Sequence, residues 1–213
     1  VTGLLFARPL LQGDSEIILT SPLESRGYVE LTLSVLEEFG VAVQEIPQGW
    51  HVPGGQTYRP HDCHVEGDWS QAAFFLCMAA LSPTGAPVEI HGLRDKSLQG
   101  DKSCVEWFRR FGLEISWRGD TLSACNPRAG QPYGGLRGLT IDASQIPDMV
   151  PALAVCAAFS QGETRIINAQ RLRLKESDRL AAMAEAISGL GGRAEATADG
   201  LVIQGAPWLQ GGT

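Results

Sequence analysis

The sequence is short of positive charge. Its 213 residues include 24 aspartates and glutamates but only 17 lysines and arginines, a formal net charge of −7 with histidine neutral. A negative surface is repelled by phosphate backbones and by anionic lipid headgroups. We therefore expect neither a nucleic acid nor a membrane surface as a partner.

Long apolar runs are also absent. No run approaches the roughly 20 residues needed to span a bilayer, and the start shows no charged segment followed by an apolar core and a cleavage site. The chain opens instead on Val1-Thr-Gly-Leu-Leu-Phe-Ala, a helical pattern without an initiator methionine. We interpret it as an internal fragment of a longer protein.

Paired cysteine motifs are missing as well. The five cysteines are scattered, at Cys63, Cys77, Cys104, Cys125 and Cys156. Cys77 and Cys156 lie in apolar stretches with helical spacing, where we expect buried thiols in a reducing compartment, the cytoplasm. His61, Cys63 and His64 could suggest a metal site, but no second ligand cluster lies nearby in sequence. We therefore expect a polar strand or loop there, with no metal and no organic cofactor.

The composition supplies a core and many turns. Hydrophobic residues make up 44% of the chain, beside 25 glycines and 12 prolines, as in a globular protein rich in turns. A chain of this length forms one large domain or two small ones. The turn residues of 53–60 favour a boundary just after them, which gives domains at 1–65 and 66–213.

A pattern of elements occurs three times along the chain. Each copy begins with an apolar helix rich in small residues, followed by a strand, an amphipathic helix ending at a glycine, and two strands joined by a turn. The expected first helices cover 3–11, 72–81 and 150–159, and the strands after them 16–20, 88–91 and 164–168. The second helices end at Gly40, Gly112 and Gly191, and the paired strands cover 41–44 with 50–52, 113–117 with 121–125, and 193–196 with 201–204.

Opening strands are expected before the second and third copies, at 62–66 and 138–142. Each complete copy is then a βαβαββ unit, and the first copy lacks its opening strand. The interval of about 70–80 residues exceeds that of solenoid repeats, so each copy is a subdomain. The small residues favour helices packed together inside and sheets outside, an α/β (α+β) architecture.

Against the negative background, residues 171–179 form a positive island. The four cations are Arg171, Arg173, Lys175 and Arg179, and the two carboxylates are Glu176 and Asp178. Alternation of cations with leucines up to Lys175 predicts an extended segment with its cations on one side, and apolar spacing from Glu176 onward predicts a helix. The free N–H groups of that helix and Arg179, one turn inside, would bind an anion. The alternative is an ordinary helix start with first-turn carboxylates and a Glu176–Arg179 pair.

The string Arg173-Leu-Lys-Glu-Ser-Asp-Arg179 resembles the R-[VL]-K-E-[ST]-D-R signature of the 5-enolpyruvylshikimate-3-phosphate synthases, in the enolpyruvyl transferase family. The resemblance implies two domains, each of three βαβαββ units with helices inside, that close over the substrates. It covers the whole chain but only about half of a typical member. Residues 1–65 would be the last unit of the first domain, and 66–213 the first two units of the second.

Two further motifs match the family. Ser25-Arg-Gly-Tyr28 resembles its S-x-x-Y loop, whose hydroxyls bind shikimate 3-phosphate, although a serine before a helix is by itself a typical N-cap. Ile146-Pro-Asp148 resembles its I-P-D motif, whose aspartate contacts the shikimate 5-hydroxyl and is a candidate base. A proline at the first helical position and a carboxylate in the first turn also suit a plain helix start.

Other parts of the resemblance are structural, and some are missing. Val65-Glu-Gly-Asp-Trp-Ser resembles a V-E-G-D-x-S segment, in which we expect Asp68 or Ser70 to cap the next helix. Arg171 stands where some members have a substrate-binding asparagine, so that contact is not expected here. The family's N-terminal Lys-Ser pair and its Asn-Ala-Gly-Thr, Ser-Ser-Gln and Asp-His-Arg segments, which supply most of the grip on phosphoenolpyruvate, do not occur in the chain.

The resemblance implies transfer of the enolpyruvyl group of phosphoenolpyruvate to the 5-hydroxyl of shikimate 3-phosphate, with release of phosphate, in the shikimate pathway of aromatic amino acid biosynthesis. It assigns Asp148 to the hydroxyl, Lys175 and Glu176 to proton transfer, Arg179 to phosphoenolpyruvate, and Ser25 with Tyr28 to shikimate 3-phosphate. Asp148 and Lys175 also count as substrate-binding residues. We expect no cofactor and a monomer, with the substrates held between the two domains and the fragment alone inactive.

Three alternatives stay open. A sister enzyme transfers the same group to UDP-N-acetylglucosamine, but it normally uses a cysteine on a mobile loop and lacks the K-E-[ST]-D-R string. An RNA-end-binding or cyclising protein built on similar units would be expected to have a less acidic surface. A non-catalytic interaction module would not depend on a carboxylate such as Asp148.

Overall fold

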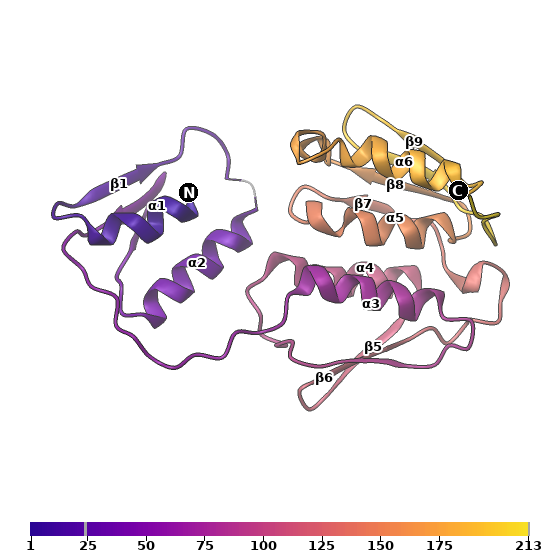
Figure 1. Cartoon of the computed structure of the whole chain (residues 1–213), viewed down its shortest axis with the longest axis horizontal. Helices are drawn as coiled ribbons and strands as arrows, with labels where there is room; N and C mark the ends of the chain where they lie inside the picture. The colour runs from indigo at the N-terminus through magenta and orange to yellow at the C-terminus, as the bar shows by residue number, and fades with distance from the viewer. Residues whose placement is uncertain (24, 213) are drawn as a thin grey trace. The chain divides into compact units, whose positions relative to one another are not determined.

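The computed structural model describes residues 1–23 and 25–212, which divide into two compact units. Unit 1 comprises Val1–Val65 together with Leu98–Gly100, and unit 2 comprises Glu66–Ser97 and the chain from Asp101 onward. Figure 1 shows the helices and strands of each unit. Within the described ranges, no helix combines the length and the apolar character needed to cross a membrane.

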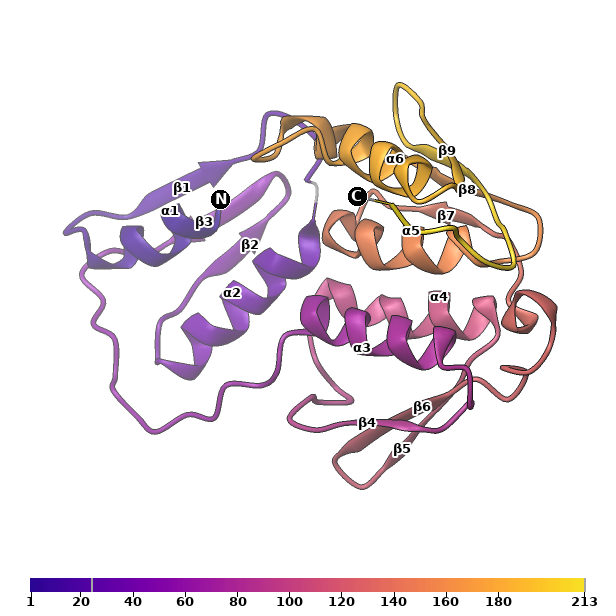
Figure 2. The same ribbon diagram turned by 45° about the vertical axis from the view of Figure 1, so that its right-hand side comes forward.

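Unit 1 is a three-stranded antiparallel sheet with two helices packed against it (Figure 2). Its elements are α1 (Thr2–Ala7), the short 3-10 helix η1 (Arg8–Leu10), β1 (Ser15–Ile18), α2 (Arg26–Glu38), β2 (Gln44–Ile46) and β3 (Gly49–Val52). Ile17 of β1 lies opposite Trp50 of β3, and both side chains are buried. Leu5 of α1 and Leu36 of α2 complete this core, so the apolar sides of both helices are used to cover the sheet.

Unit 2 contains a three-stranded and a four-stranded sheet. Its α-helices are α3 (Trp69–Leu81), α4 (Cys104–Phe111), α5 (Val150–Ala158) and α6 (Arg179–Gly189). Its strands are β4 (Val88–Ile90), β5 (Glu114–Arg118), β6 (Thr121–Cys125), β7 (Thr140–Asp142), β8 (Glu163–Ile167), β9 (Arg193–Ala196) and β10 (Leu201–Gln204). Short 3-10 helices are η2 (Gly100–Ser103), η3 (Pro132–Gly135), η4 (Pro147–Met149) and η5 (Gln170–Leu174).

The threefold repeat is visible in the strand order. The sheets run β1-β3-β2, β4-β6-β5 and β7-β8-β10-β9, so the last strand of every copy lies between the other two. In the third copy β7 adds the expected opening strand, parallel to β8, with Thr140 opposite Arg165. The helix-strand-helix-strand-strand order of all three copies is therefore confirmed.

The opening strand expected at 62–66 is wrong, because these residues form neither a helix nor a strand. Beside β4 the chain makes a backbone hydrogen bond from the Gly67 N–H to the Gly92 carbonyl, 2.7 Å long, after the expected segment has ended. Alternating polar and apolar residues predict a strand only where a neighbouring edge accepts its hydrogen bonds. The segment is a loop in which His61 packs its ring on Phe39, with centroids 4.5 Å apart.

Helices α3 and α5 form the interior of unit 2. Their buried side chains are mostly small: Ala72, Ala73, Ala79 and Ala80 on α3, and Ala152, Ala154, Ala157 and Ala158 on α5. Small side chains let helix axes approach closely, and the Sγ atoms of Cys77 and Cys156 lie 3.4 Å apart. Both thiols are free and buried, as expected.

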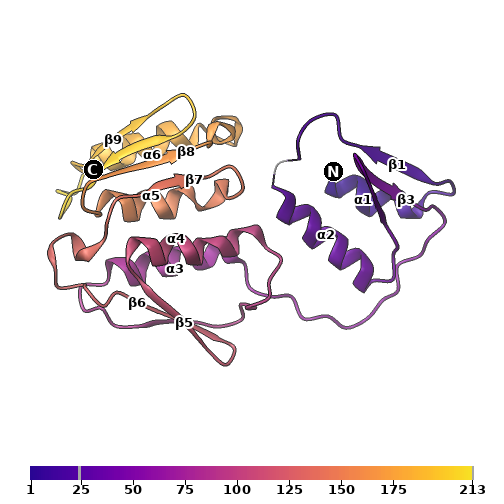
Figure 3. The same ribbon diagram turned by 180° about the vertical axis from the view of Figure 1, so that it is seen from behind.

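The helices lie inside and the sheets outside, as expected. Helices α3 and α4 lie side by side over the β4-β6-β5 sheet (Figure 3), and α5 and α6 cover one face of the four-stranded sheet (Figure 2). Because α3 packs on α5, the two helical layers meet between the two sheets. The starts of α5 and α6 carry the residues of the candidate site.

Local chemistry sets the ends of the helices. The Asp68 carboxylate accepts a hydrogen bond from the Ser70 N–H at 2.7 Å and caps α3, as one of the two expected caps. The three glycines expected after the second helices, Gly40, Gly112 and Gly191, have φ of 76°, 128° and 85°. Glycine adopts these angles without steric penalty, so the helices end there.

Candidate active site

The structure brings together four of the six predicted site residues. Asp148, Lys175, Glu176 and Arg179 form one cluster of ion pairs in unit 2. Ser25 and Tyr28 belong to unit 1 and start α2 there. Each group is built by its own unit and is described in turn.

Asp148 lies where a 3-10 turn leads into α5. Pro147 occupies the first position of η4, as predicted, and Asp148 follows in the same turn. The Oδ1 atom of Asp148 accepts a hydrogen bond from Nη1 of Arg179 at 2.7 Å and lies 3.6 Å from Nζ of Lys175. A single carboxylate oxygen of η4 therefore contacts two cations, one at the end of η5 and one at the start of α6.

Arg179 is the first residue of α6, where we expected it one turn further in. Its guanidinium forks between two carboxylates, since Nη1 donates to Asp148 and Nη2 donates to Oε2 of Glu176 at 3.0 Å. Partial burial would lower the pKa of Arg179, but the hydrogen bonds to Asp148 and Glu176 outweigh it and raise the pKa above its usual value. The planar fork is thus already oriented for anionic oxygens.

Glu176 lies at the outer edge of the cluster, with 80% of its side chain exposed. Its pKa is lowered, first by its own backbone N–H and then by the hydrogen bond from Arg179. At neutral pH Glu176 is therefore an anion that pairs with Arg179. The predicted i,i+3 pair with Glu176 therefore uses the same Arg179 guanidinium that the anion-site interpretation assigns to an anion.

The extended cationic segment expected at 171–175 is wrong. Residues 170–174 form the 3-10 helix η5, and only Lys175 has extended angles. Leu172 is buried and Leu174 is 87% exposed, so the two leucines do not share a buried face. Arg173 and Lys175 consequently bind different partners, Asp178 and Asp148 respectively.

Asp178 serves as the N-cap of α6. Its Oδ1 accepts a hydrogen bond from the Ala181 N–H at 3.0 Å, and its Oδ2 accepts one from Nη1 of Arg173. The Ala181 N–H is the main cause of its lowered pKa, and Arg173 adds to the effect. Asp178 thus belongs to the start of α6, at the N-cap and not in the first turn where the alternative interpretation placed it.

Three hydrogen bonds near the cluster could not be predicted from the sequence. Arg173 also donates to the carbonyls of Thr197 and Ala198, in the turn between β9 and β10. Nδ2 of Asn168, at φ 58°, donates to Oδ2 of Asp142 at 2.9 Å and joins the ends of β8 and β7. These partners lie 24 to 26 residues apart in sequence, where no local spacing relates them.

Ser25 holds the N-cap position of α2 but does not act as a conventional cap. Its φ and ψ of 52° and 48° are left-handed, and its side chain makes no capping hydrogen bond to α2. A left-handed serine costs on the order of 1–2 kcal/mol. Tyr28, in the first turn, is 38% exposed. The plain N-cap interpretation of Ser25 is therefore wrong.

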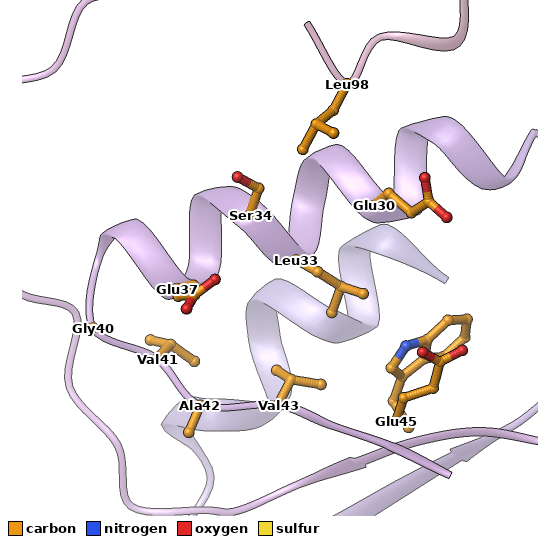
Figure 4. A pocket seen from close by; sticks show the side chains of 11 residues that line it. Glu30, Leu33, Ser34, Glu37, Gly40, Val41, Ala42, Val43, Glu45 and Leu98 are labelled. Atoms are coloured by element: carbon orange, nitrogen blue, oxygen red, sulfur yellow. The ribbon is translucent and has the colours of Figure 1, made fainter. Parts of the chain in front are cut away.

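A cavity of about 740 Å³ lies elsewhere in unit 1, between α2 and the chain leading to β2 (Figure 4). Glu30, Glu37 and Glu45 line it together with apolar residues, and the predicted site residues are not among its lining. The lining is acidic although Arg26 pairs with two of its carboxylates, Glu30 and Glu45, and an acidic lining repels an anion. The cavity is therefore poorly suited to phosphorylated substrates.

Comparison with known proteins identifies relatives along the whole chain. The family model of EPSP synthase (3-phosphoshikimate 1-carboxyvinyltransferase) matches residues 1–213. A 3-phosphoshikimate 1-carboxyvinyltransferase of Clostridioides difficile (strain 630) is 45% identical over 213 residues, which cover 100% of this chain and 46% of that protein. Its counterpart in Clostridium beijerinckii is 42% identical over 212 residues, which cover 99% and 47%.

Solved structures share the fold. EPSP synthase from Acinetobacter baumannii has a TM-score of 0.76 at 24% identity, over 98% of this chain and 46% of that one. The enolpyruvyl transferase NikO from Streptomyces tendae has a TM-score of 0.66 at 20% identity, over 92% and 44%. This chain spans about half the length of the curated relatives it matches. Since the family model matches from residue 1 to residue 213, the chain belongs to the EPSP synthase family.

Proposed function

We propose that the full-length protein carrying this chain transfers the enolpyruvyl group of phosphoenolpyruvate to the 5-hydroxyl of shikimate 3-phosphate and releases phosphate. The observation that carries the proposal is the cluster at the starts of η4 and α6, where Lys175 and Arg179 both reach Asp148. It supplies, in one place, a carboxylate for the hydroxyl proton and cations for two anionic substrates. Membership of the EPSP synthase family supports the same reaction.

Asp148 is the base for the 5-hydroxyl in this proposal. Pro147 fixes the backbone of η4, and the turn places Asp148 at the N-terminal end of α5, where the helix field favours an anion. A positioned carboxylate within hydrogen-bond reach of the hydroxyl contributes about 10²- to 10⁴-fold to the rate. The proton leaves the hydroxyl oxygen as that oxygen attacks the enolpyruvyl carbon.

The second proton transfer, to the methylene carbon, falls to Lys175 or Glu176, and it is reversed when the C–O bond to phosphate breaks, phosphate leaves and the carbon–carbon double bond reforms. The lowered pKa of Glu176 keeps it ionised near neutrality, so it has no proton to give at rest. A lysine side chain is a proton donor, and Nζ of Lys175 lies 3.6 Å from Oδ1 of Asp148, the oxygen that Arg179 also contacts. We therefore assign the donor to Lys175, with Glu176 holding the guanidinium of Arg179.

Each unit supplies substrate-binding residues in this proposal. Arg179 offers its planar fork to phosphoenolpyruvate, and the hydroxyls of Ser25 and Tyr28 hold shikimate 3-phosphate. Residues 1–65 are then the last repeat unit of one domain, without its opening strand, and 66–213 the first two repeat units of the other. Because the chain spans about half of its relatives, we expect it to be inactive by itself.

The free cysteines indicate the cellular compartment in which the protein works. A biosynthetic enzyme with five free cysteines, two of them in van der Waals contact, suits the reducing cytoplasm. We propose a monomeric protein in the shikimate pathway that needs neither nucleic acid nor membrane as a partner. Gel filtration of the full-length protein measures the oligomeric state directly.

The test combines growth and turnover. The full-length protein should restore growth to a strain auxotrophic for aromatic amino acids because it lacks this activity. Purified protein should release phosphate from phosphoenolpyruvate with shikimate 3-phosphate, and UDP-N-acetylglucosamine should not replace it. Growth failure with soluble protein, or turnover of the UDP-sugar alone, would rule the assignment out.

A further inference from the structure

We propose that Arg173 is a positioning residue, which clamps the loop 174–177 so that Lys175 reaches Asp148. The inference rests on the proposed function for its catalytic consequence. Its structural basis is a set of contacts within unit 2 that involve neither substrate nor Asp148. Arg173 thus acts through Lys175 and has no direct role in the chemistry.

Arg173 makes three polar contacts on two elements. Its Nη1 donates to Oδ2 of Asp178, its Nη2 donates to the Thr197 carbonyl, and its Nε donates to the Ala198 carbonyl at 3.3 Å. The side chain is 32% exposed, so these bonds are partly shielded from water. A guanidinium has a rigid planar fork that can meet such partners together, whereas a lysine ammonium cannot.

The ion pair with Asp178 closes the loop that carries the candidate catalytic residues. Leu174, Lys175, Glu176 and Ser177 lie between the two partners. Asp178 is itself fixed as the N-cap of α6 by the Ala181 N–H at 3.0 Å. The loop therefore ends at Asp178, which is fixed to α6. Arg173, at the beginning of the loop, is paired with the same Asp178.

The hairpin turn supplies the rigid anchor. The Thr197 N–H donates to the Gly200 carbonyl at 2.9 Å, and the Asp199 carbonyl accepts from the Ala169 N–H at 2.6 Å. The turn thus joins β9 to β10 and also holds the chain just before η5. Through Thr197 and Ala198, Arg173 fastens the loop to the four-stranded sheet itself.

Burial contributes little to holding this loop. Leu174 is 87% exposed and the Glu176 side chain 80% exposed, so neither side chain buries much apolar surface against the unit. The placement of Lys175, whose Nζ lies 3.6 Å from Oδ1 of Asp148, depends instead on polar contacts such as those of Arg173. Misplacing a catalytic group by about 1 Å can lower the rate about 10²-fold.

The variants Arg173→Gln and Arg173→Lys, made in the full-length protein, test the clamp. We expect kcat to fall about 10- to 100-fold in both, with the KM for each substrate changed by less than about threefold, because Arg173 contacts no substrate. Arg173→Lys keeps the charge, so a loss there shows that the fork is needed. Arg165→Gln is the matched control, since Arg165 pairs with Glu163 on β8 at 2.6 Å and lies outside the loop; its kcat should equal that of wild type.

Amide hydrogen exchange provides a readout that does not depend on the reaction. Residues 174–177 should exchange faster in Arg173→Gln than in wild type, while the amides of α5 keep their protection. If Arg173→Gln fails to fold, Arg173→Lys decides on the same criteria. If the wild-type protein shows no turnover, the proposed function is refuted, but faster exchange of residues 174–177 in Arg173→Gln still supports the clamp.

Three results would overturn the inference. The first is a kcat for Arg173→Gln and Arg173→Lys within about threefold of wild type. The second is a raised KM for phosphoenolpyruvate at unchanged kcat, which would show that Arg173 binds substrate directly. The third is unchanged exchange of residues 174–177.

Discussion

Replacing Asp148 by asparagine separates its two expected roles, in the chemistry and in the ion-pair cluster. Asparagine has the same shape and keeps an oxygen that can accept the hydrogen bond from Nη1 of Arg179, now 2.7 Å from Oδ1. It cannot accept a proton from the shikimate hydroxyl. The variant therefore removes the base while leaving the packing around η4 in place.

The expected loss of kcat and the expected loss of folding stability differ in size. Loss of a general base lowers kcat about 10²- to 10⁴-fold, or about 2.7–5.4 kcal/mol at about 1.36 kcal/mol per tenfold. The ion pair joins side chains that are 29% and 30% exposed, and such pairs contribute on the order of 1 kcal/mol to folding. That corresponds to a fall in Tm of no more than about 4 °C.

In the full-length protein, phosphate release at saturating substrates measures kcat, and thermal unfolding of the same preparation measures Tm. Asp120→Asn is the control, because Asp120 is an exposed carboxylate in the turn between β5 and β6. We expect its kcat and Tm to match those of wild type. A kcat for Asp148→Asn within about tenfold of wild type would refute the assignment of Asp148 as the base. A fall in Tm above about 10 °C with little loss of activity would instead make it a structural residue.

Three further outcomes follow from the structure. The Ala181 N–H, and after it Arg173, lowers the pKa of Asp178 below the ordinary aspartate value of 3.8. The stabilisation that these contacts give is fully present above pH 3.8 and is lost as the pH falls through the lowered pKa. The Tm of Asp178→Asn should therefore vary less than that of wild type below about pH 4. In thiol titration, the exposed Cys63 should react in the native protein, whereas the buried Cys104, whose pKa burial raises to about 12, should react only after unfolding. Leu153→Ala, at a fully buried site of α5, should lower the free energy of unfolding by about 2–5 kcal/mol. Leu174→Ala, at an 87% exposed site, should change it by less than about 0.5 kcal/mol. Similar losses in both variants would show that the core is misassigned.

The repeat could be predicted from the sequence because its signals are local. Gly40, Gly112 and Gly191 follow the second helices, and a glycine after the last apolar position ends a helix wherever it occurs. The start of α3 is also local, since Asp68 caps a helix that begins at the next residue. Such features require only a few neighbouring residues, so a single sequence contains them.

The errors occurred where a distant partner decides the outcome. Leu172 and Leu174 are the same residue type two positions apart, yet one is buried and the other is 87% exposed. The Arg173 contacts to Thr197 and Ala198 favour the 3-10 turn over the extended chain that alternation predicts. Residues 62–66 fail as a strand for a related reason, since the β4 edge lies over twenty residues further along the chain.

The positive island of the sequence is also changed by folding. Arg173 is matched by Asp178, and Lys175 and Arg179 are matched by Asp148 and Glu176, so the paired charges sum to zero. Under the proposed function, an anionic substrate that binds Arg179 competes there with Asp148 and Glu176.

Of the two carboxylates on Arg179, Glu176 is 80% exposed and Asp148 is 30% exposed. Water can solvate the exposed carboxylate after it is displaced, whereas the more buried one would lose its partner in a less polar setting. Under the proposed function, we therefore expect an anionic substrate to displace Glu176, which leaves Asp148, the proposed base, in place. Under the proposed function, the helix-start interpretation describes these residues without substrate, and the anion-site interpretation describes them with substrate bound.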